Sequence, residues 1–359
     1  MKPRIHNLVT FHSGMIDDFL FLLNLADNAH ANDSSIETKI FVTRNASFFK
    51  EIVAEHYPFV HIIPLKQDGV SSKYYRYNAL KNIWETAISR NAFFLLKFFK
   101  GDSLKTLIFG WLLTRIHGSK FIGFGEDYLF FKKILCTDIC HFDLKKDYFY
   151  NLLSLTDRLG WKRIINRPVF RYTPNKNILV KYNLDNTTFI VMHITPSRKL
   201  WTFPIPRWKK VVDQTLSFMP EATVILTGSR DDFSFVQKLA SLYANNKVKN
   251  YAGKFTPTEL VSAIHYASLY IGVDTGITHL ASMMGQKSLV IGHNWAPPSL
   301  PTYAPNTIVL RNKEMCRCVG NGTFTCFAEK DGVQYTRCTL YITDEMVEKA
   351  LEKLLGKRK

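Results

Sequence analysis

The sequence lacks any uncharged apolar run that approaches the roughly 20 residues of a membrane-spanning helix. Its most apolar stretch, residues 91–121, is interrupted by charged side chains, which are Lys97, Lys100, Asp102, Lys105 and Arg115. The first residues also lack the apolar core, about 7–15 residues long, that a secretory signal contains. These absences predict a cytoplasmic protein.

The regularly spaced lysines of residues 91–121 leave two interpretations open. The favoured one is a pair of core helices whose lysine ammonium groups reach solvent. In the other, the segment lies in a membrane interface and the protein rests peripherally on that membrane.

Acidic residues are scarce: 30 Asp and Glu stand against 47 Lys and Arg, a formal net charge of +17. Residues 158–210 alone hold twelve basic residues and one acid, Asp185. Such a surplus favours an anionic partner, which would be nucleic acid, a membrane surface or a phosphorylated small molecule. The sequence has no aromatic-glycine RNA motif, no Cys/His finger and no basic heptads. We therefore expect no nucleic-acid partner, and a non-catalytic basic binder of nucleic acid or membrane is the least favoured alternative.

At 359 residues, the chain is long enough for two hydrophobic cores, and its 46% hydrophobic content excludes disorder. Short apolar strands alternate with helical patterns, which predicts parallel sheets covered on both faces. The expected strands are 5–12, 38–43, 61–65, 120–125, 187–195, 222–229, 269–274 and 287–292.

We predict an α/β protein with two facing, doubly wound, Rossmann-like domains and a cleft between them. Their boundaries are 1–172 and 173–342, followed by a helix at 343–359 that packs back toward the first domain. Residues 166–177 contain two prolines and little apolar periodicity, which is typical of a linker. This is the architecture of GT-B glycosyltransferases, which a few epimerases and phosphorylases share.

One expected strand stops at Asp274, Thr275 and Gly276, and His279 follows three residues later. Loops after the strands of such a sheet lie at its carboxyl edge, where ligands bind. A helix that begins there offers free N–H groups and a partial positive charge to a phosphate. The alternative is an ordinary turn in which Asp274 caps the helix and His279 packs beneath it, and the spacing alone favours neither.

The stretch IGVDTGITHLASMMGQKSLVIG resembles the D-[ST]-G-x-x-H-x-A motif of glycosyltransferase family 9, the heptosyltransferases that build the inner core of lipopolysaccharide. The similarity is strong from 187 to 311 and looser before 140. Further segments resemble that family in the same order, and they are 13–23, 141–160, 193–212, 224–233 and 251–264.

The resemblance implies an inverting, metal-independent transfer of a sugar, heptose from ADP-heptose, to an acidic lipid-linked saccharide of the lipopolysaccharide or lipooligosaccharide inner core. The domain at 1–172 would bind the acceptor and the domain at 173–342 the nucleotide sugar. The enzyme would work on the cytoplasmic side of the inner membrane. A transferase of the same family with another nucleotide sugar or acceptor is the alternative.

The resemblance also assigns site residues. Asp17 would be the catalytic base, with Asp18 as the fallback, unless both acids cap the helix that follows. The donor diphosphate would be bound by Thr195, Lys199, Asp274, Thr275, Gly276 and His279. The nucleoside would contact Gly228, Asp232 or Asp231, and Phe255. His293 and Asn294 are candidates for contact with the sugar.

Three of these residues also have a purely structural interpretation. Lys199 fits a solvated surface lysine, Phe255 fits a core aromatic, and His279 fits a packing residue that braces its loop rather than a proton donor.

Three loops depart from the family pattern. Ile194 and Thr195 stand where the family has Pro-Gly, Gly14 lies three residues before Asp17, and residues 292–306 replace a Gly-Pro-Thr type of turn. Because these loops would face the sugar, they leave its identity more open than the type of reaction.

No Asp-x-Asp pair occurs, so we expect no divalent metal and no cofactor besides the donor substrate. Four cysteines cluster near the C-terminus, Cys316, Cys318, Cys326 and Cys338, without the paired C-x-x-C spacing of zinc sites. Reduced thiols or a local disulfide are favoured over a structural metal. Cys136 and Cys140, four residues apart, are expected to be buried apolar residues of a helix. No oligomeric state is predicted.

Overall fold

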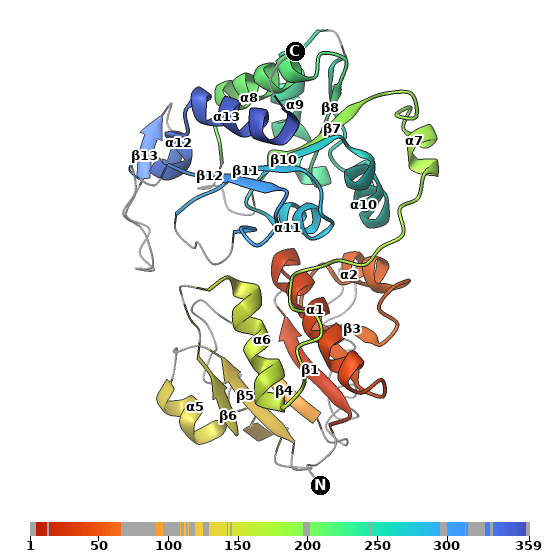
Figure 1. The fold of residues 1–359 in the computed structure, drawn as a ribbon, viewed down its shortest axis with the longest axis vertical. Coiled ribbons are helices and arrows are strands. Elements are labelled where there is room, and N and C mark those ends of the chain that lie inside the picture. Colours follow the sequence, from red (N-terminus) through yellow and green to blue (C-terminus); the bar gives the residue numbers. More distant parts are fainter. Residues whose placement is uncertain are drawn as a thin grey trace. The chain divides into compact units, whose positions relative to one another are not determined.

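The computed structural model describes residues 5–12, 14–65, 91–95, 108, 111–112, 114, 119–124, 129–141, 143, 146–196, 202–244, 246–294, 300–312, 314, 327–330 and 333–356. The chain divides into two compact units, Met1–Pro168 and Val169–Lys359. Each unit contains a parallel sheet, with six strands among the described residues (Figure 1).

The first sheet has the order β3-β2-β1-β4-β5-β6. Its strands are β1 (Asn7–His12), β2 (Glu37–Val42), β3 (Val60–Pro64), β4 (Asn91–Leu95), β5 (Lys120–Phe124) and β6 (Asp138–Cys140). The helices described with it are α1 (Ile16–Asn32), α2 (Ala46–Val53), α5 (Leu129–Leu135) and α6 (Tyr148–Leu159). The strand order reverses between β1 and β4, so the loop after β1 opens at the switch point of this sheet.

Helix α1 carries three asparagines at a spacing of four residues, Asn24, Asn28 and Asn32, which therefore lie on one face. Asn28 is completely buried. Its Oδ1 accepts hydrogen bonds from the N–H groups of Ile164 (2.7 Å) and Ile165 (2.9 Å), and its Nδ2 donates to the Ile165 carbonyl (3.0 Å). These hydrogen bonds hold residues 164–165, which precede the second unit in sequence, against α1.

The second sheet has the order β12-β11-β10-β7-β8-β9. Its strands are β7 (Phe189–His193), β8 (Thr223–Thr227), β9 (Val248–Asn250), β10 (Leu269–Val273), β11 (Ser288–Ile291) and β12 (Thr307–Leu310). The helices of this unit are α7 (Asn177–Lys181), α8 (Ile205–Phe218), α9 (Phe233–Ala240), α10 (Pro257–Tyr266), α11 (Gly276–Met283), α12 (Arg337–Leu340) and α13 (Asp344–Leu355). A hairpin of β13 (Phe327–Lys330) and β14 (Val333–Thr336) precedes α12.

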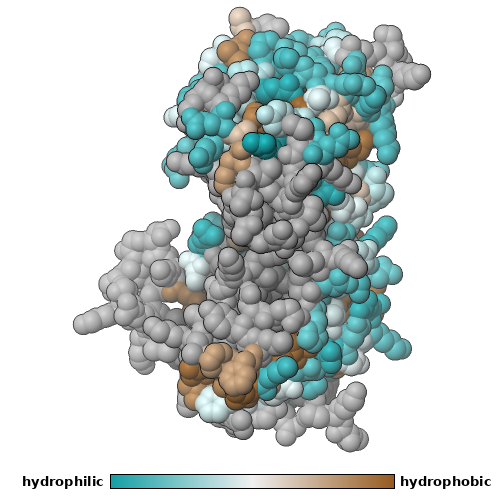
Figure 2. Space-filling view, turned by 90° about the vertical axis from the view of Figure 1, so that its left-hand side faces the viewer, coloured by the Kyte–Doolittle hydropathy of each residue, from teal (hydrophilic) through white to brown (hydrophobic). Residues whose placement is uncertain are grey.

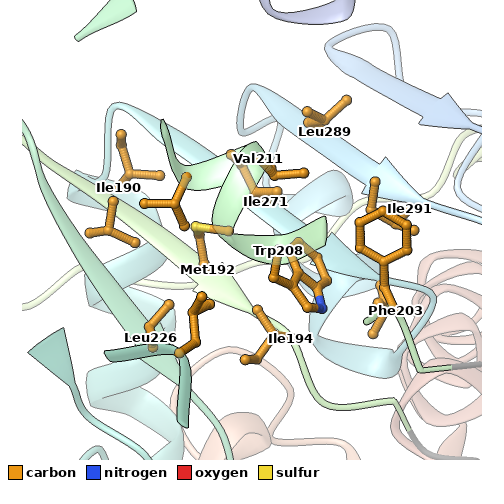
Figure 3. Packing of buried hydrophobic residues seen from close by; sticks show 14 of the residues in the cluster. Ile190, Met192, Ile194, Phe203, Trp208, Val211, Leu226, Ile271, Leu289 and Ile291 are labelled. Carbon is orange, nitrogen blue, oxygen red and sulfur yellow. The ribbon is translucent and has the colours of Figure 1, made fainter. Parts of the chain in front are cut away.

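Every second side chain along β7 contributes to the main hydrophobic core of this unit. Ile190, Met192 and Ile194 lie on one face of the sheet and pack with Trp208 of α8, all of them fully buried (Figure 3). Helix α13 packs on α8 and adds Leu351 to the same core. Figure 1 shows α8, α9 and α13 on one side of the sheet and α10 and α11 on the other. The sheet is thus covered on both faces, as its continuous apolar strands predict.

One local expectation is confirmed and two are wrong. Helix α10 begins with the predicted capping box, in which Thr256 and Glu259 exchange hydrogen bonds. The start of residues 91–121 is not helical, because the short apolar run of β4 pairs with β1 as a central strand. Cys136 and Cys140 do not share a helix, since α5 ends at Leu135 and Cys140 closes β6.

Among the described residues, no helix has both the length and the apolar character needed to cross a membrane. Most of residues 96–118, where an interfacial segment was considered, lies outside the described part of the chain.

Candidate functional site

The carboxyl edge of the second sheet brings the ends of β7 and β10 side by side. These strands pair directly, with Gly272 opposite His193, and the strand order reverses between them. Ligands of open α/β sheets bind at such a switch point. Thr195 follows β7 here, and Asp274, Thr275 and Gly276 follow β10.

Helix α11 begins at this edge with backbone donors available. Thr275 is its N-cap, and the Thr275 hydroxyl accepts a hydrogen bond from the N–H of Thr278 (3.4 Å). The N–H groups of Gly276 and Ile277 have no acceptor among the described residues. The first turn of a helix with open N–H groups is suited to an anion, because those groups and the helix dipole both favour negative charge.

Thr195 provides a second donor at the same edge. It is 7% exposed, and its Oγ1 has no hydrogen-bond partner within the described part of the chain. Buried hydroxyls are nearly always satisfied, so an unsatisfied one beside free helix N–H groups indicates a place that a polar ligand could occupy.

Asp274 lies between two buried histidines. His293 Nε2 is 2.9 Å from Asp274 Oδ2, and His279 Nε2 is 3.6 Å from Asp274 Oδ1. Burial alone would raise the pKa of Asp274, but hydrogen bonds from His279 and His293 outweigh it and hold that pKa well below its usual range. Asp274 is therefore an ionised carboxylate inside the protein.

His279 makes a further contact on its other side. Its Nδ1 lies 3.0 Å from the hydroxyl of Tyr303, and the two rings stack at a centroid distance of 6.0 Å. This geometry is that of a residue that braces the turn after β10. A direct contact of His279 with a diphosphate stays a prediction.

The end of β8 is shaped by close backbone packing. Gly228 accepts a hydrogen bond at its carbonyl from the N–H of Gly253 (2.9 Å), and a Cβ on Gly253 would come 2.8 Å from Arg230 Cα. Asp232 closes a capping box with Ser229, so its Oδ2 is already engaged. Asp231 is exposed beside it and Asp232 is half-buried.

Phe255 belongs to an aromatic cluster. Its ring stacks with Tyr251 at 5.4 Å and meets the edge of Tyr182 at 4.6 Å. The ring remains half-buried rather than buried. Packing on a base therefore stays a prediction for Phe255, which already has a role within the protein.

The side chain of Asn294 is buried. It is 2% exposed, its Nδ2 donates to the carbonyl of Asn312 (3.1 Å), and its N–H points to Cys338 Sγ (3.3 Å). Its neighbour His293 reaches Asp274 instead. Contact of either residue with a sugar stays a prediction, and their observed partners are protein groups.

Lys199 lies outside the described residues, as do three of the clustered cysteines, Cys316, Cys318 and Cys326. Over the part of the chain that is described, no group of three or more His, Cys, Asp or Glu residues is arranged to hold a metal ion.

The first unit has its own set of polar residues, in the loop after β1. The N-cap of α1 is Met15, and Asp17 and Asp18 follow in the first turn. Neither acid is therefore the N-cap residue. Both lie at the carboxyl edge of the sheet, close to its switch point.

The two acids are electrostatically distinct. Burial raises the pKa of Asp18, the neighbouring charge of Asp17 raises it further, and a hydrogen bond with Tyr148 of α6 opposes both effects. Burial and the nearby acids also raise the pKa of Tyr148. These effects favour a proton on Asp18.

Sequence reasoning missed Arg44, which lies against this loop. Gly14 has φ +91°, and a Cβ on Gly14 would come 2.3 Å from Arg44 Cγ, so only glycine permits this approach. Burial and the Arg44 charge lower the pKa of His12 to about 3. The available signal was the position of Arg44 just past the end of β2.

Comparison with known proteins finds a family match for part of this chain. Residues 172–323 match the sequence model of glycosyltransferase family 9 (heptosyltransferase). A search of curated proteins finds no significant match.

Solved structures resemble the chain over nearly its whole length. Escherichia coli ADP-heptose LPS heptosyltransferase II has a TM-score of 0.70 at 14% identity, covering 98% of each chain. A family 9 glycosyltransferase from Veillonella parvula has a TM-score of 0.71 at 17% identity, covering 99% of this chain and 98% of that one. E. coli heptosyltransferase WaaC with ADP-2-deoxy-2-fluoro heptose has a TM-score of 0.60 at 14% identity, covering 97% and 99%.

At these identities the structural likeness shows the fold. It confirms the predicted α/β class with parallel sheets and the GT-B architecture.

Proposed function

We propose that the chain, whose residues 172–323 match the sequence model of glycosyltransferase family 9, transfers a heptose from ADP-heptose, with inversion and without a divalent metal. The acceptor that we propose is the acidic, lipid-linked inner core of lipopolysaccharide or lipooligosaccharide. A heptosyltransferase that resembles this chain was solved with an ADP-heptose analogue, which supports the donor.

The observation that carries the proposal is the set of donors at the carboxyl edge of the second sheet. The N–H groups of Gly276 and Ile277 and the buried hydroxyl of Thr195 lie at the switch point between β7 and β10. A departing nucleoside diphosphate develops negative charge, and fixed donors of this kind stabilise it. Lys199, which follows β7 in the sequence and lies outside the described residues, would add a positive charge.

The donor is tested by thermal unfolding of the whole chain with ADP, UDP or GDP, each in EDTA and in magnesium. We expect ADP to raise the melting temperature, with no requirement for magnesium. Stabilisation by UDP or GDP instead would assign another nucleotide sugar within the same family. Stabilisation by oligonucleotides and by none of the three nucleotides would contradict the proposal.

The catalytic base that we propose is Asp17. An inverting transfer needs one base to take the proton from the acceptor hydroxyl, and the raised pKa of Asp18 makes Asp18 the less suitable acid of the pair. We expect Asp17→Asn to abolish transfer while ADP still binds. Asp18→Asn is the matched control, and if it alone abolished transfer, the fallback assignment would replace Asp17.

A lipid-linked acceptor would bring the enzyme to a membrane surface, and α5 supports this. Phe130, Phe131 and Ile134 of this short helix are 71%, 38% and 59% exposed. Figure 2 shows hydrophobic surface on the side of the first unit where α5 lies. The sequence around it, 91–133, has seven Lys or Arg and three Asp or Glu. Lys132 is buried, and the remaining basic excess suits an anionic bilayer.

Vesicle co-sedimentation tests this localisation. We expect binding to vesicles that contain anionic lipid, and we expect Phe130→Ser with Ile134→Ser to weaken it at unchanged ADP binding. Val180→Ser is the control, because Val180 is 67% exposed but lies on α7 of the other unit. Equal loss in the control would contradict a role for α5.

A further inference from the structure

His293 is held in place by the elements around it. Strands β10 and β11 pair in register through Val273 and Ile291, so the residues that follow each strand leave the sheet together. Gly292 donates its N–H to the Leu310 carbonyl (2.8 Å), which continues the sheet by one residue. On the other side, the side chain of Asn294 is bound to Asn312.

The imidazole fixed in this way reaches the carboxylate of Asp274. His293 Nε2 lies 2.9 Å from Asp274 Oδ2, which is a close imidazole–carboxylate contact. His293 is 1% exposed and Asp274 is 6% exposed, so solvent screens this contact little. His279 approaches the other carboxylate oxygen from α11.

The direction in which Asp274 is held has a consequence for the helix beside it. Asp274 immediately precedes Thr275, the N-cap of α11. A carboxylate near free helix N–H groups is itself a favourable ligand for them. If it turned toward Gly276 and Ile277, it would occupy the donors proposed for the diphosphate and would repel that anion.

We propose that His293 is a positioning residue that keeps the Asp274 carboxylate away from the α11 N–H groups and thereby keeps them open for a diphosphate. This inference rests on the proposed function. It differs from the sequence-based expectation that His293 faces the transferred sugar, because a positioning role also affects the binding of a nucleoside diphosphate that lacks the transferred sugar.

Two substitutions separate these roles. In His293→Gln, the side-chain amide nitrogen can take the place of imidazole Nε2 and still donate to Asp274. In His293→Asn, the shorter side chain places its amide near the Nδ1 position and cannot reach. The probe is ADP, which lacks the transferred sugar. Its affinity for each variant is measured by calorimetry, together with the melting temperature, the donor KM and kcat.

We expect His293→Asn to weaken ADP binding on the order of 10-fold, which corresponds to about 1.4 kcal/mol, and to raise the donor KM. His293→Gln should restore most of the ADP affinity. Unchanged ADP affinity in a folded His293→Asn protein overturns the positioning role. If kcat falls at unchanged ADP affinity, His293 contacts the sugar instead. If only the melting temperature falls, His293 has a structural role alone. Equal loss in both variants overturns it as well. Failure of the unchanged protein to bind any nucleoside diphosphate would instead contradict the proposed function.

Discussion

Asp232 Oδ2 accepts hydrogen bonds from both the backbone N–H (2.7 Å) and the hydroxyl (2.6 Å) of Ser229. The carboxylate predicted to bind a ribose is therefore also a structural group that closes the turn after β8. One oxygen, Oδ1, is left to contact a ligand.

Asp232→Ala should accordingly lower both stability and nucleotide affinity. Loss of the capping interaction costs about 0.5–2 kcal/mol of unfolding free energy. Urea unfolding and ADP calorimetry measure the two effects, with Asp231→Ala as the exposed control. An Asp232→Ala protein with reduced stability but full ADP affinity would restrict Asp232 to its structural role.

Thr195→Val removes a hydroxyl without changing the shape of the side chain. Because this Oγ1 has no partner among the described residues, its loss should not destabilise the fold. ADP affinity should fall by about 1.5–3 kcal/mol, the range of a hydrogen bond to a charged group. Thr188→Val, an exposed change before β7 at the opposite edge of the sheet, should leave affinity unchanged. Tighter or equal ADP binding by Thr195→Val would remove Thr195 from the donor site.

Asn28→Ala should be among the most destabilising single changes in the first unit. It would leave the part-buried N–H groups of Ile164 and Ile165 without their acceptor, at about 1–3 kcal/mol for each group that water cannot reach. Asn32→Ala is the matched control, because its contacts with Lys162 are exposed and should cost less. Chemical denaturation would rank them, and equal losses would show that burial at Asn28 is not decisive.

Stability should depend on pH through His193. Burial lowers its pKa to about 4 from 6.5, although the Asp232 charge opposes this, so His193 is neutral in the folded protein and takes up a proton more readily when unfolded. Its contribution is therefore complete above pH 6.5 and is lost as the pH falls toward 4. Between those values the unfolding free energy of the unchanged protein should fall by up to about 3 kcal/mol more than that of His193→Gln. Parallel pH profiles would contradict this.

Regular patterns in the sequence were sufficient for much of the second unit. Apolar strands, the capping box at Thr256 and the polar residues after β10 depend on neighbours in sequence, so short windows predict them. The same local reasoning was wrong for residues 91–95, where a short apolar run suits either a helix or a central strand.

The contacts around Asp274 could not be predicted. His293 follows Asp274 by nineteen positions and reaches it only because β11 lies beside β10 in the sheet. Arg44 is brought to Gly14 in the same way, by the pairing of β1 with β2. Such contacts are set by strand order, and residue spacing does not encode strand order.

The central claim is that a nucleoside diphosphate binds where β7 and β10 end, and a crystal structure of the chain with ADP tests it most directly. The account predicts phosphate oxygens within hydrogen-bond distance of the N–H groups of Gly276 and Ile277 and of Thr195 Oγ1. ADP bound elsewhere, with the Asp274 carboxylate or an apolar side chain seated on those N–H groups, would contradict it.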